Sequence, residues 1–537
     1  MNSNEINPNA PETEAPQEKE SSSLHELQLR RVRAQLLGGS DAVASWHDKG
    51  RMTARERIDA LADADSFYEL GALAGKGRYD EQGRYLGVTP SNCVMGRARV
   101  ANRPLMVVAD DYTIRGGSSE AAVSDKWIYG ERMAKEFRMP LVRLVDSAGG
   151  SVKVLEQSGR TKIPGYVLWP CTEMMSQVPV ASIAFGACVG LGAVRAIAAH
   201  FSVMVKDQSQ VCAAGPPVVL QGLGQDVSKE ELGGYALCTQ VSGIINNVAD
   251  SEQDALDQVK RFLSYLPLNA WELPMQLSCN DDPQRKNDEL DTIIPENRRK
   301  TYSAKKIVET IFDRDSMFEI SPGYGASLRV YLTRLNGRSV GAMINDPCSM
   351  GGGLTRAAAT KMERFVDLCD SFHLPIVNLV DQPGVMIGLE AERAGTLMAA
   401  ARASAAIEQA SVPWISIIIR RAFGVAGSML GPWQGPTGTS LNHRFAWPTA
   451  RWGSIPIEGG VAAAYRREIE AARDPKAKRE ELEAYYQRLS SPFRTAENFG
   501  VVDIIRPAET RSLLCSWVDD AARLTAISPV PKARGMR

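Results

Sequence analysis

"LVDSAG" occupies residues 144–149, and "LVDQPG" occupies residues 379–384, beginning 235 residues later. In each copy an apolar run ends in an aspartate, and a turn that contains glycine follows. Other features recur in the same order at the same offset: Gly116-Gly117 with Gly351-Gly352, Lys126 with Lys361, and Pro140 with Pro375. Solenoid repeats have periods of about 20–50 residues, far shorter than this one. The repeat therefore predicts two homologous domains in one chain.

The two halves share one coarse pattern of strands and helices. In each, an apolar run (residues 104–111 and 339–346) is followed by a glycine-rich turn and a stretch of helix length. A strand that starts after a proline comes next, and a third apolar strand leads into a turn of small residues. Strands that alternate with helices are typical of βαβ units, so we predict an α/β fold with a largely parallel sheet in each half.

Composition changes along the chain suggest the domain boundaries. Residues 1–23 are polar and rich in proline, glutamate and serine, which is typical of a disordered tail. Residues 278–300 are charged and contain proline, which favours a linker between the halves. We expect an N-terminal domain over residues 24–285 and a C-terminal domain over residues 286–537. Thr53 and Glu56 have the spacing of a capping box, so a helix is expected to begin there.

The overall composition excludes several classes of protein. The 537 residues carry a net charge of −1, so no overall field attracts nucleic acid or an anionic membrane. Apolar residues make up 44% of the chain, yet no apolar run is long enough to span a bilayer. Nine scattered cysteines form no CxxC pair, which argues against a zinc ribbon or a disulfide framework. We expect a cytoplasmic protein that binds neither nucleic acid nor membrane.

Two turns built from small residues carry the strongest chemical signal. They read "ACVGLGAV" (residues 187–194) and "AFGVAGSM" (residues 422–429), and each follows an apolar strand. Where such a turn opens a helix, backbone N–H groups are left unpaired and can bind an oxyanion. The alternative is that small residues only allow a strand and a helix to pack closely. Because the turns occupy equivalent positions in the repeat, we favour two oxyanion sites.

Side-chain chemistry is less well supported. The five histidines show no spacing typical of a metal site, and we expect no metal in this chain. No phosphate-binding loop and no GxSxG nucleophile motif is present. Asp146 and Asp381 end strands beside glycine turns, where an aspartate most often caps a turn. We interpret both as structural, with direct acid/base chemistry as the alternative.

Several long stretches resemble the carboxyltransferase (β) subunit of biotin-dependent acyl-CoA carboxylases, in the propionyl-, methylcrotonyl- and geranyl-CoA carboxylase group. They are "KGRMTARERIDALADADSFYEL", "VDSAGG", "GACVGLGAV", "EELGG", "DALDQVKRFLSYLP", "RFVDLCDSFHLPIVNLVDQPG" and "FAWPTARWG". The resemblance runs over roughly residues 25–530. It implies two tandem crotonase-like domains of the ββα superhelix type, with the N-terminal domain of one subunit facing the C-terminal domain of another in a homo-oligomer, usually a hexamer.

The resemblance also implies a division of labour between the two turns. Backbone amides at Gly190, Leu191 and Gly192 would hold the enolate oxygen of an acyl-CoA thioester, and those at Gly424, Val425 and Ala426 the ureido oxygen of biotin. Biotin would arrive on a carrier domain. The chain contains no "AMKM" biotinylation motif, so we expect a separate α subunit to supply the biotin carboxylase and carrier functions.

Further residues are expected at the binding surfaces for coenzyme A and biotin. Arg51 and Arg55, with Lys49, are candidates for the CoA phosphates, and a solvent-exposed helix start is the equal alternative. The candidate glycines are Gly116, Gly117, Gly149, Gly150 and Gly384. Arg195 and Ser428 stand where the family carries residues that shape acyl-chain choice, so we expect the acyl group to differ from plain propionyl.

The turns depart from the Gly-Gly-Ala that the family usually has. Leu191 and Val425 add bulk there and require a negative φ angle, while the backbone amides remain. Carboxyl transfer from carboxybiotin to acyl-CoA is the leading hypothesis. The alternatives are the reverse transfer in a decarboxylase complex, and an inactive scaffold that only assembles a carboxylase.

Overall fold

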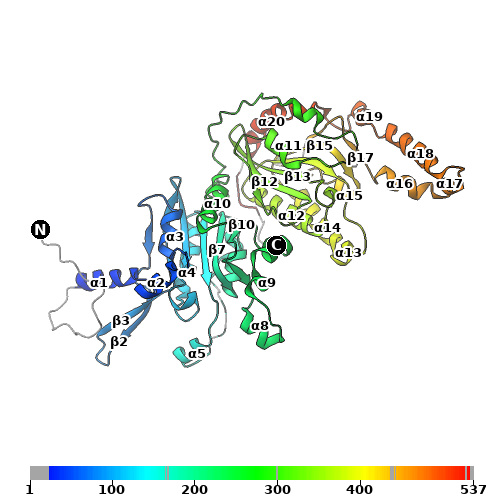
Figure 1. Cartoon of the computed structure of the whole chain (residues 1–537). Helices are drawn as coiled ribbons and strands as arrows, with labels where there is room; N and C mark the ends of the chain where they lie inside the picture. Colours follow the sequence, from blue (N-terminus) through cyan, green and yellow to red (C-terminus); the bar gives the residue numbers. More distant parts are fainter. Residues whose placement is uncertain are drawn as a thin grey trace.

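A computed structural model gives the structure of this chain and describes residues 23–532 except 162, 164, 166–167, 298–299, 434, 436–440, 442 and 527–528. The described chain is built on two eight-stranded sheets, one in each half (Figure 1). The predicted disordered tail lies outside the described residues apart from Ser23. That residue is the first of helix α1 (Ser23–Gln35).

The two sheets have the same strand order. The first runs β1 (Tyr68–Leu70), β4 (Cys93–Val100), β5 (Arg103–Asp110), β6 (Leu141–Ser147), β7 (Val180–Val189), β8 (Phe201–Val205) and β10 (Asn247–Ala249), with β9 (Gln210–Cys212) beside β7. The second runs β11 (Phe318–Ile320), β12 (Leu328–Leu335), β13 (Arg338–Asn345), β14 (Ile376–Gln382), β15 (Trp414–Phe423), β16 (His443–Ala446) and β18 (Asp503–Ile504), with β17 (Arg451–Gly453) beside β15. The predicted duplication is confirmed at the level of topology.

Strand direction also repeats. In each half the first three strands pair antiparallel and every later pair is parallel. The ladder between the second and third parallel strands shifts register at one place in each half, between Val145 and Ser147 and between Val380 and Gln382. A bulge of this kind bends the strand and re-aims the side chain within it. The single residues that face the bulged strand are Asp146 and Asp381.

Helices cover the sheets, and several begin where the sequence predicts. Thr53 and Glu56 form the expected capping box at the start of α3 (Ala54–Leu61). The other helices of the first half are α2 (Ser40–His47), α4 (Ser124–Glu136), α5 (Lys153–Ser158), α6 (Cys171–Met174), α7 (Leu191–Ile197), α8 (Pro216–Leu223), α9 (Lys229–Gly233) and α10 (Glu252–Ser264), with short turns η1 (Arg115–Gly117) and η2 (Leu237–Val241).

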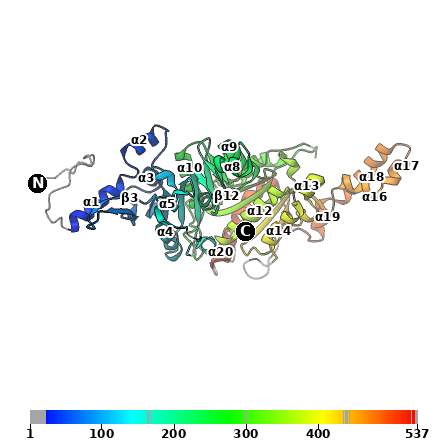
Figure 2. The same cartoon turned by 90° about the horizontal axis from the view of Figure 1, so that it is seen from below.

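The second half repeats several of these helices and adds an arm. Its elements are η3 (Asp288–Thr292), α11 (Ala304–Ile311), η4 (Met350–Gly352), α12 (Arg356–Ser371), α13 (Leu389–Arg393), α14 (Thr396–Glu408), α15 (Gly424–Gly427), η5 (Pro507–Glu509) and α20 (Thr510–Thr525). The arm comprises α16 (Ile457–Ala464), α17 (Arg466–Ala471), α18 (Pro475–Leu489) and α19 (Pro492–Glu497). It projects from one end of the molecule, and α1 with the β2–β3 hairpin (Gly75–Tyr79 and Tyr85–Pro90) lies at the other end (Figures 1 and 2).

The two halves pack directly on one another. Phe201 of β8 meets Phe318 of β11 edge to face, with ring centroids 5.3 Å apart. The Asn246 amide donates to the Ser321 hydroxyl at 2.9 Å, and the His373 imidazole lies 2.7 Å from the Ala270 carbonyl oxygen. A single hydrophobic core cluster contains buried residues of both halves. The junction is therefore part of the folded core of the chain.

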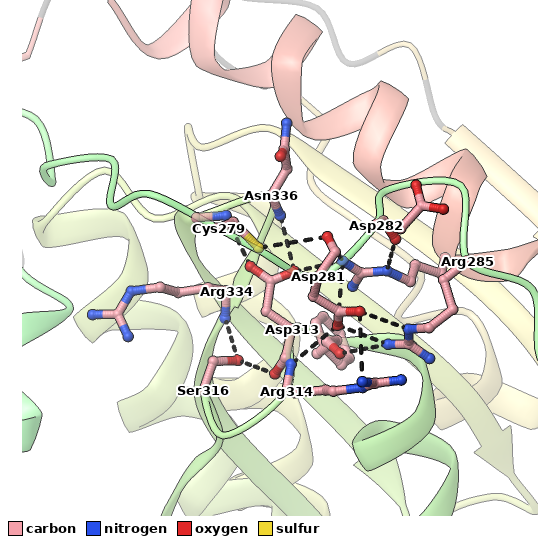
Figure 3. Close-up of polar contacts among 12 residues, drawn as sticks. Cys279, Asp281, Asp282, Arg285, Asp313, Arg314, Ser316, Arg334 and Asn336 are labelled. Carbon is pink, nitrogen blue, oxygen red and sulfur yellow. Dashed lines mark hydrogen bonds and ion pairs between the residues drawn. The ribbon is translucent and has the colours of Figure 1, made fainter.

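The segment predicted as a linker lies against the second half. Asp281 holds Arg285 by two hydrogen bonds of 2.8 and 2.9 Å (Figure 3). Arg511 of α20 donates to the Asp281 carbonyl oxygen at 3.1 Å and to the Asp313 carboxylate at 2.8 Å. The segment is thus fixed by charged side chains, and the boundary between residues 285 and 286 stays a prediction.

Gly337, in the turn between β12 and β13, fixes the start of this segment. Its φ of 76° belongs to the left-handed region, and a Cβ there would lie 1.9 Å from the Leu277 carbonyl oxygen. Gly83 has nearly the same φ, 77°, but open space around it. We expect Gly337→Ala to lower the free energy of unfolding by about 2–4 kcal/mol and Gly83→Ala by about 1 kcal/mol in urea titrations. Equal losses would contradict the steric explanation.

Candidate active site

The first small-residue turn joins β7 to α7. Gly190 caps the helix with φ 58° and ψ −117°, a conformation that favours glycine. Its N–H donates to the Cys212 carbonyl oxygen at 3.2 Å, so the expectation that Gly190 supplies a free amide is wrong. The first bond of the helix runs from the Val194 N–H to the Gly190 carbonyl oxygen. The N–H groups of Leu191 and Gly192 consequently have no partner within the helix.

The second turn, between β15 and α15, is built in the same way. Gly424 has φ 63°, close to the value at Gly190, and α15 is a single turn. Val425 and Ala426 are its next residues, and their N–H groups have no acceptor within so short a helix. The Val425 side chain is 70% exposed, whereas Leu191 packs against the core of the first half. Neither residue has a positive φ, so both side chains fit the backbone of their turn.

Asp146 occupies the bulge in the first half. Its carboxylate is fully buried and lies 3.0 Å from the Arg57 guanidinium, which also binds Glu252 at 2.7 Å. Burial raises the Asp146 pKa to about 6, against the attraction of Arg57, which lowers it. A Cβ at Gly186, opposite in the bulge, would lie 2.4 Å from its Oδ1. Only glycine leaves room for the carboxylate.

Asp381 occupies the equivalent bulge with different partners. Arg420 and Arg421, which replace Gly186 and Ala187 on the facing strand, hold it at 2.9 and 2.6 Å. The Tyr302 hydroxyl donates to it at 2.7 Å, and burial raises the pKa of that phenol well above its usual value. Both aspartates therefore belong to buried ion pairs. The interpretation that they cap turns is wrong, because the bulge points each side chain into the core.

The predicted glycines fall into two groups. Gly117 and Gly149 have positive φ, and a Cβ on either would lie within 2.8 Å of a carbonyl oxygen, Asp146 O or Val189 O. These two glycines let the loops approach the ends of β6 and β7. Gly116, Gly150 and Gly384 have no atom nearer than 3.7 Å to an added Cβ, although the positive φ of Gly116 and Gly384 still favours glycine.

Comparisons with known proteins fit this geometry. Residues 45–534 match the model of the carboxyl transferase domain. This chain belongs to the carboxyl transferase family. A propionyl-CoA carboxylase carboxyltransferase subunit of Haloferax mediterranei is 34% identical, over 91% of this chain and 94% of that protein. The methylmalonyl-CoA carboxyltransferase 12S subunit of Propionibacterium freudenreichii subsp. shermanii is 33% identical, over 92% of this chain and 93% of that protein.

A solved structure supports the same assignment. The crystal structure of transcarboxylase 12S, a hexamer with methylmalonyl-coenzyme A bound, is 30% identical with a TM-score of 0.83, over 97% of this chain and 98% of that chain. The predicted pair of crotonase-like domains is confirmed. The carboxyl transferase described here is an enzyme of the acyl-CoA carboxylase type, as its sequence predicts.

The side chains predicted to bind ligand lie in different settings. Arg51 stacks on Trp46, 4.8 Å from the ring centroid, while Arg55 is paired with Glu69 at 2.9 Å. Arg195 is buried, with one nitrogen 2.8 Å from Asp110. Ser428 is exposed and donates to the Val425 carbonyl oxygen at 2.7 Å. The roles proposed for them stay predictions.

The sequence interpretation missed the residues that hold the aspartates. Arg57 and Tyr302 lie far from the turns in the sequence, and no motif or spacing indicates that they bind the aspartates. Arg420 and Arg421 could have been found by aligning the two copies. "RRAFG" in the second copy aligns with "GACVG" in the first, so two arginines replace two small residues. Among the described residues no group of three His, Cys, Asp or Glu side chains could hold a metal ion, and no helix is long and apolar enough to cross a membrane.

The matched bulges predict losses of different size for two equivalent substitutions. Asp381→Asn takes the shared carboxylate from the buried Arg420 and the half-buried Arg421, and we expect a loss of about 3–5 kcal/mol of folding free energy. Asp146→Asn leaves Arg57 bound to Glu252, so we expect about 1–2 kcal/mol. Urea titration monitored by circular dichroism measures both. Similar costs for the two variants would contradict the roles assigned to Arg57, Arg420 and Arg421.

The raised pKa of Asp146 predicts a pH dependence. The unfolded carboxyl has a pKa of about 4, so between roughly pH 4 and 6 the folded state holds a proton that the unfolded state releases. This contribution to stability is complete below pH 4 and is lost as the pH rises through 6. The stability of the wild type relative to Asp146→Asn should therefore fall from pH 4 to pH 7. A constant difference would show that Asp146 titrates normally.

Proposed function

We propose that this enzyme transfers the carboxyl group of carboxybiotin, borne by a separate carrier subunit, to an acyl-CoA. The observation that carries the proposal is the pair of turns at Gly190 and Gly424. Each ends the third parallel strand of its half, has a glycine of positive φ, and presents N–H groups of the next two residues. The two pairs of donors match the two carbonyl oxygens on which negative charge develops during this transfer.

In this proposal the chemistry runs through the backbone. The N–H groups of Leu191 and Gly192 stabilise the thioester oxygen as the substrate carbon loses its proton. The N–H groups of Val425 and Ala426 stabilise the ureido oxygen of biotin as the carboxyl group leaves it. Fixed dipoles lower the cost of both charges because they need no reorganisation during the reaction.

The charges behind the two turns support this assignment. Behind the second turn, Arg420 and Arg421 both bind the carboxylate of Asp381. Behind the first turn, Arg57 is shared by Asp146 and Glu252. Two guanidinium groups thus lie behind the second turn and one behind the first, which favours the ureido anion at the second turn.

Exposed apolar side chains support a homo-oligomer, and we propose that this oligomer is a hexamer. Val152 and Leu155 of the first half are 81% and 46% exposed, and Ile387 and Leu389, which follow the equivalent strand of the second half, are 85% and 65% exposed. Matching apolar surfaces on the two halves suit an interface in which the N-terminal half of one subunit faces the C-terminal half of another. The related transcarboxylase 12S is described as a hexamer.

Partner, cofactor and compartment follow from the proposed reaction. Biotin would come from the α subunit, coenzyme A would be part of the substrate, and this chain would hold no metal. All nine cysteines are free thiols in the structure. A chain rich in free thiols suits the reducing cytoplasm.

A decarboxylase that runs the reverse transfer is the second candidate. The methylmalonyl-CoA decarboxylase subunit alpha of Veillonella parvula is 31% identical, over 91% of this chain and 93% of that protein. The two functions separate in one assay, in which the chain is combined with a biotin carboxylase and carrier subunit, ATP, bicarbonate and a panel of acyl-CoA esters. ATP-dependent formation of a carboxylated acyl-CoA supports the proposal. If no ester gives a product, the decarboxylase and the inactive scaffold are the functions that remain.

The backbone amide of Gly192 is open to a direct test. Gly192→Pro removes the N–H, and we expect turnover to fall about 100- to 1,000-fold. Gly192→Ala keeps the N–H and adds a methyl group 3.2 Å from the Ser147 Cβ, so it controls for bulk. Ala426→Pro and Ala426→Gly form the matching pair in the second turn. Circular dichroism and oligomer size must first show that each variant folds. A folded, fully active Gly192→Pro would contradict the proposal.

Arg51, which stacks on Trp46 and has no carboxylate partner among the described residues, is the better candidate for the CoA phosphates. Arg51→Ala should raise the KM for acyl-CoA about three- to tenfold with kcat unchanged, because it removes a charge that binds substrate and transition state equally. Arg55→Ala removes the partner of Glu69 and should lower thermal stability instead. If Arg51→Ala leaves the KM unchanged, the segment is an ordinary solvated helix start.

A further inference from the structure

Lys361 of α12 is a buried lysine that forms no ion pair with another described residue. It is 4% exposed, and its ammonium group donates to the Ser321 carbonyl oxygen at 3.1 Å. No carboxylate of the described residues lies within 4.0 Å of it. The nearest acidic side chains, Glu319 and Asp346, are bound by Arg329 at 2.9 and 2.5 Å. Two of the three ammonium hydrogens therefore lack a strong acceptor.

A small cavity at the junction of the two halves is lined by Lys361. Its polar lining residues are His200 and Asn246 of the first half, and Ser321, Tyr324, Lys361 and Arg364 of the second. The volume is about 30 Å³. One water needs about 10–15 Å³ of such space, so a linear molecule of three heavy atoms fits.

The lining of the cavity contains no carboxylate and one cation besides Lys361, Arg364, while the nearby Glu319 and Asp346 are held by Arg329. The His200 imidazole accepts the Val180 N–H through Nδ1 and faces the Met175 carbonyl oxygen through Nε2, and burial lowers its pKa to about 4, so it is neutral. Arg364 uses one of its five N–H donors on the Gly243 carbonyl oxygen, at 2.8 Å. Arg364 and Lys361 line the same cavity, three residues apart on one helix.

We propose that dissolved carbon dioxide modifies Lys361 to a carbamate in this cavity. The neutral amine attacks the carbon of CO2, an N–C bond forms, and one C–O electron pair moves onto oxygen. A proton then leaves the nitrogen for water. The buried cation becomes an anion that pairs with Arg364. This modification is separate from the two oxyanion turns and does not depend on the proposed carboxyl transfer.

Burial supplies the reactive form of the amine. It lowers the Lys361 pKa to about 7, so a substantial fraction of the amine is neutral near physiological pH. Lys126 occupies the equivalent position of the first half, is 7% exposed, and also has a pKa lowered by burial. It packs beside Gly71 rather than at the junction cavity. The chain thus contains its own control lysine.

The test uses the full-length protein in buffer containing ¹³C-bicarbonate and dissolved ¹³CO2 at fixed pH. Carbamates are trapped as esters with a trialkyloxonium reagent, and peptides are read by mass spectrometry. We expect the labelled group on Lys361, none on Lys126, and none at position 361 in Lys361→Met. Arg364→Gln should lower the labelled fraction about two- to fivefold, as expected for one partly exposed charge pair.

Two results would overturn the proposal. Wild-type protein without label on Lys361 would show that no carbamate forms. Equal label on Lys126 and Lys361 would show that any buried lysine reacts, so that the cavity has no role. Both results come from the wild-type chain, and neither depends on whether Lys361→Met folds.

Discussion

One buried carboxylate in a strand bulge is the constraint from which each half of this enzyme is built. At Asp146 and at Asp381 the ladder between the second and third parallel strands loses its register, and the side chain points into the core. A carboxylate without water must be paired, so arginine side chains have to reach it. Those contacts fix the end of the third strand, and the small-residue turn starts directly after it.

The buried aspartate is paired with arginine side chains from different elements in the two halves. This difference bears on function. In the first half Gly186 makes room, and Arg57 arrives from a helix near the start of the domain. In the second half Arg420 and Arg421 come from the strand itself, and Arg421 also donates to the Gly351 carbonyl oxygen at 2.7 Å. The same turn is therefore held in two electrostatic settings, which suits two different carbonyl oxygens.

The sequence predicts the repeat, the parallel sheets and both turns because these depend on local patterns. A strand that ends in Asp-x-x-Gly twice, at one offset, is visible without a structure. The bulges are not visible, because they arise when three residues of one strand face one of its neighbour. For that reason the sequence pattern predicts turn caps at the aspartates and gives no indication of Arg57 and Tyr302. The engaged N–H of Gly190 was missed for a similar reason, since its acceptor, Cys212, belongs to a separate strand.

The central claim is that each turn stabilises one oxyanion through its backbone. Titration calorimetry with two CoA ligands tests it, an anionic mimic of the thioester enolate and a neutral thioether of the same length. The account predicts that Gly192→Pro weakens binding of the anionic mimic about 100-fold and leaves the thioether unchanged, while Ala426→Pro changes neither. Equal weakening of both ligands by Gly192→Pro, or loss of the mimic in Ala426→Pro, would contradict it.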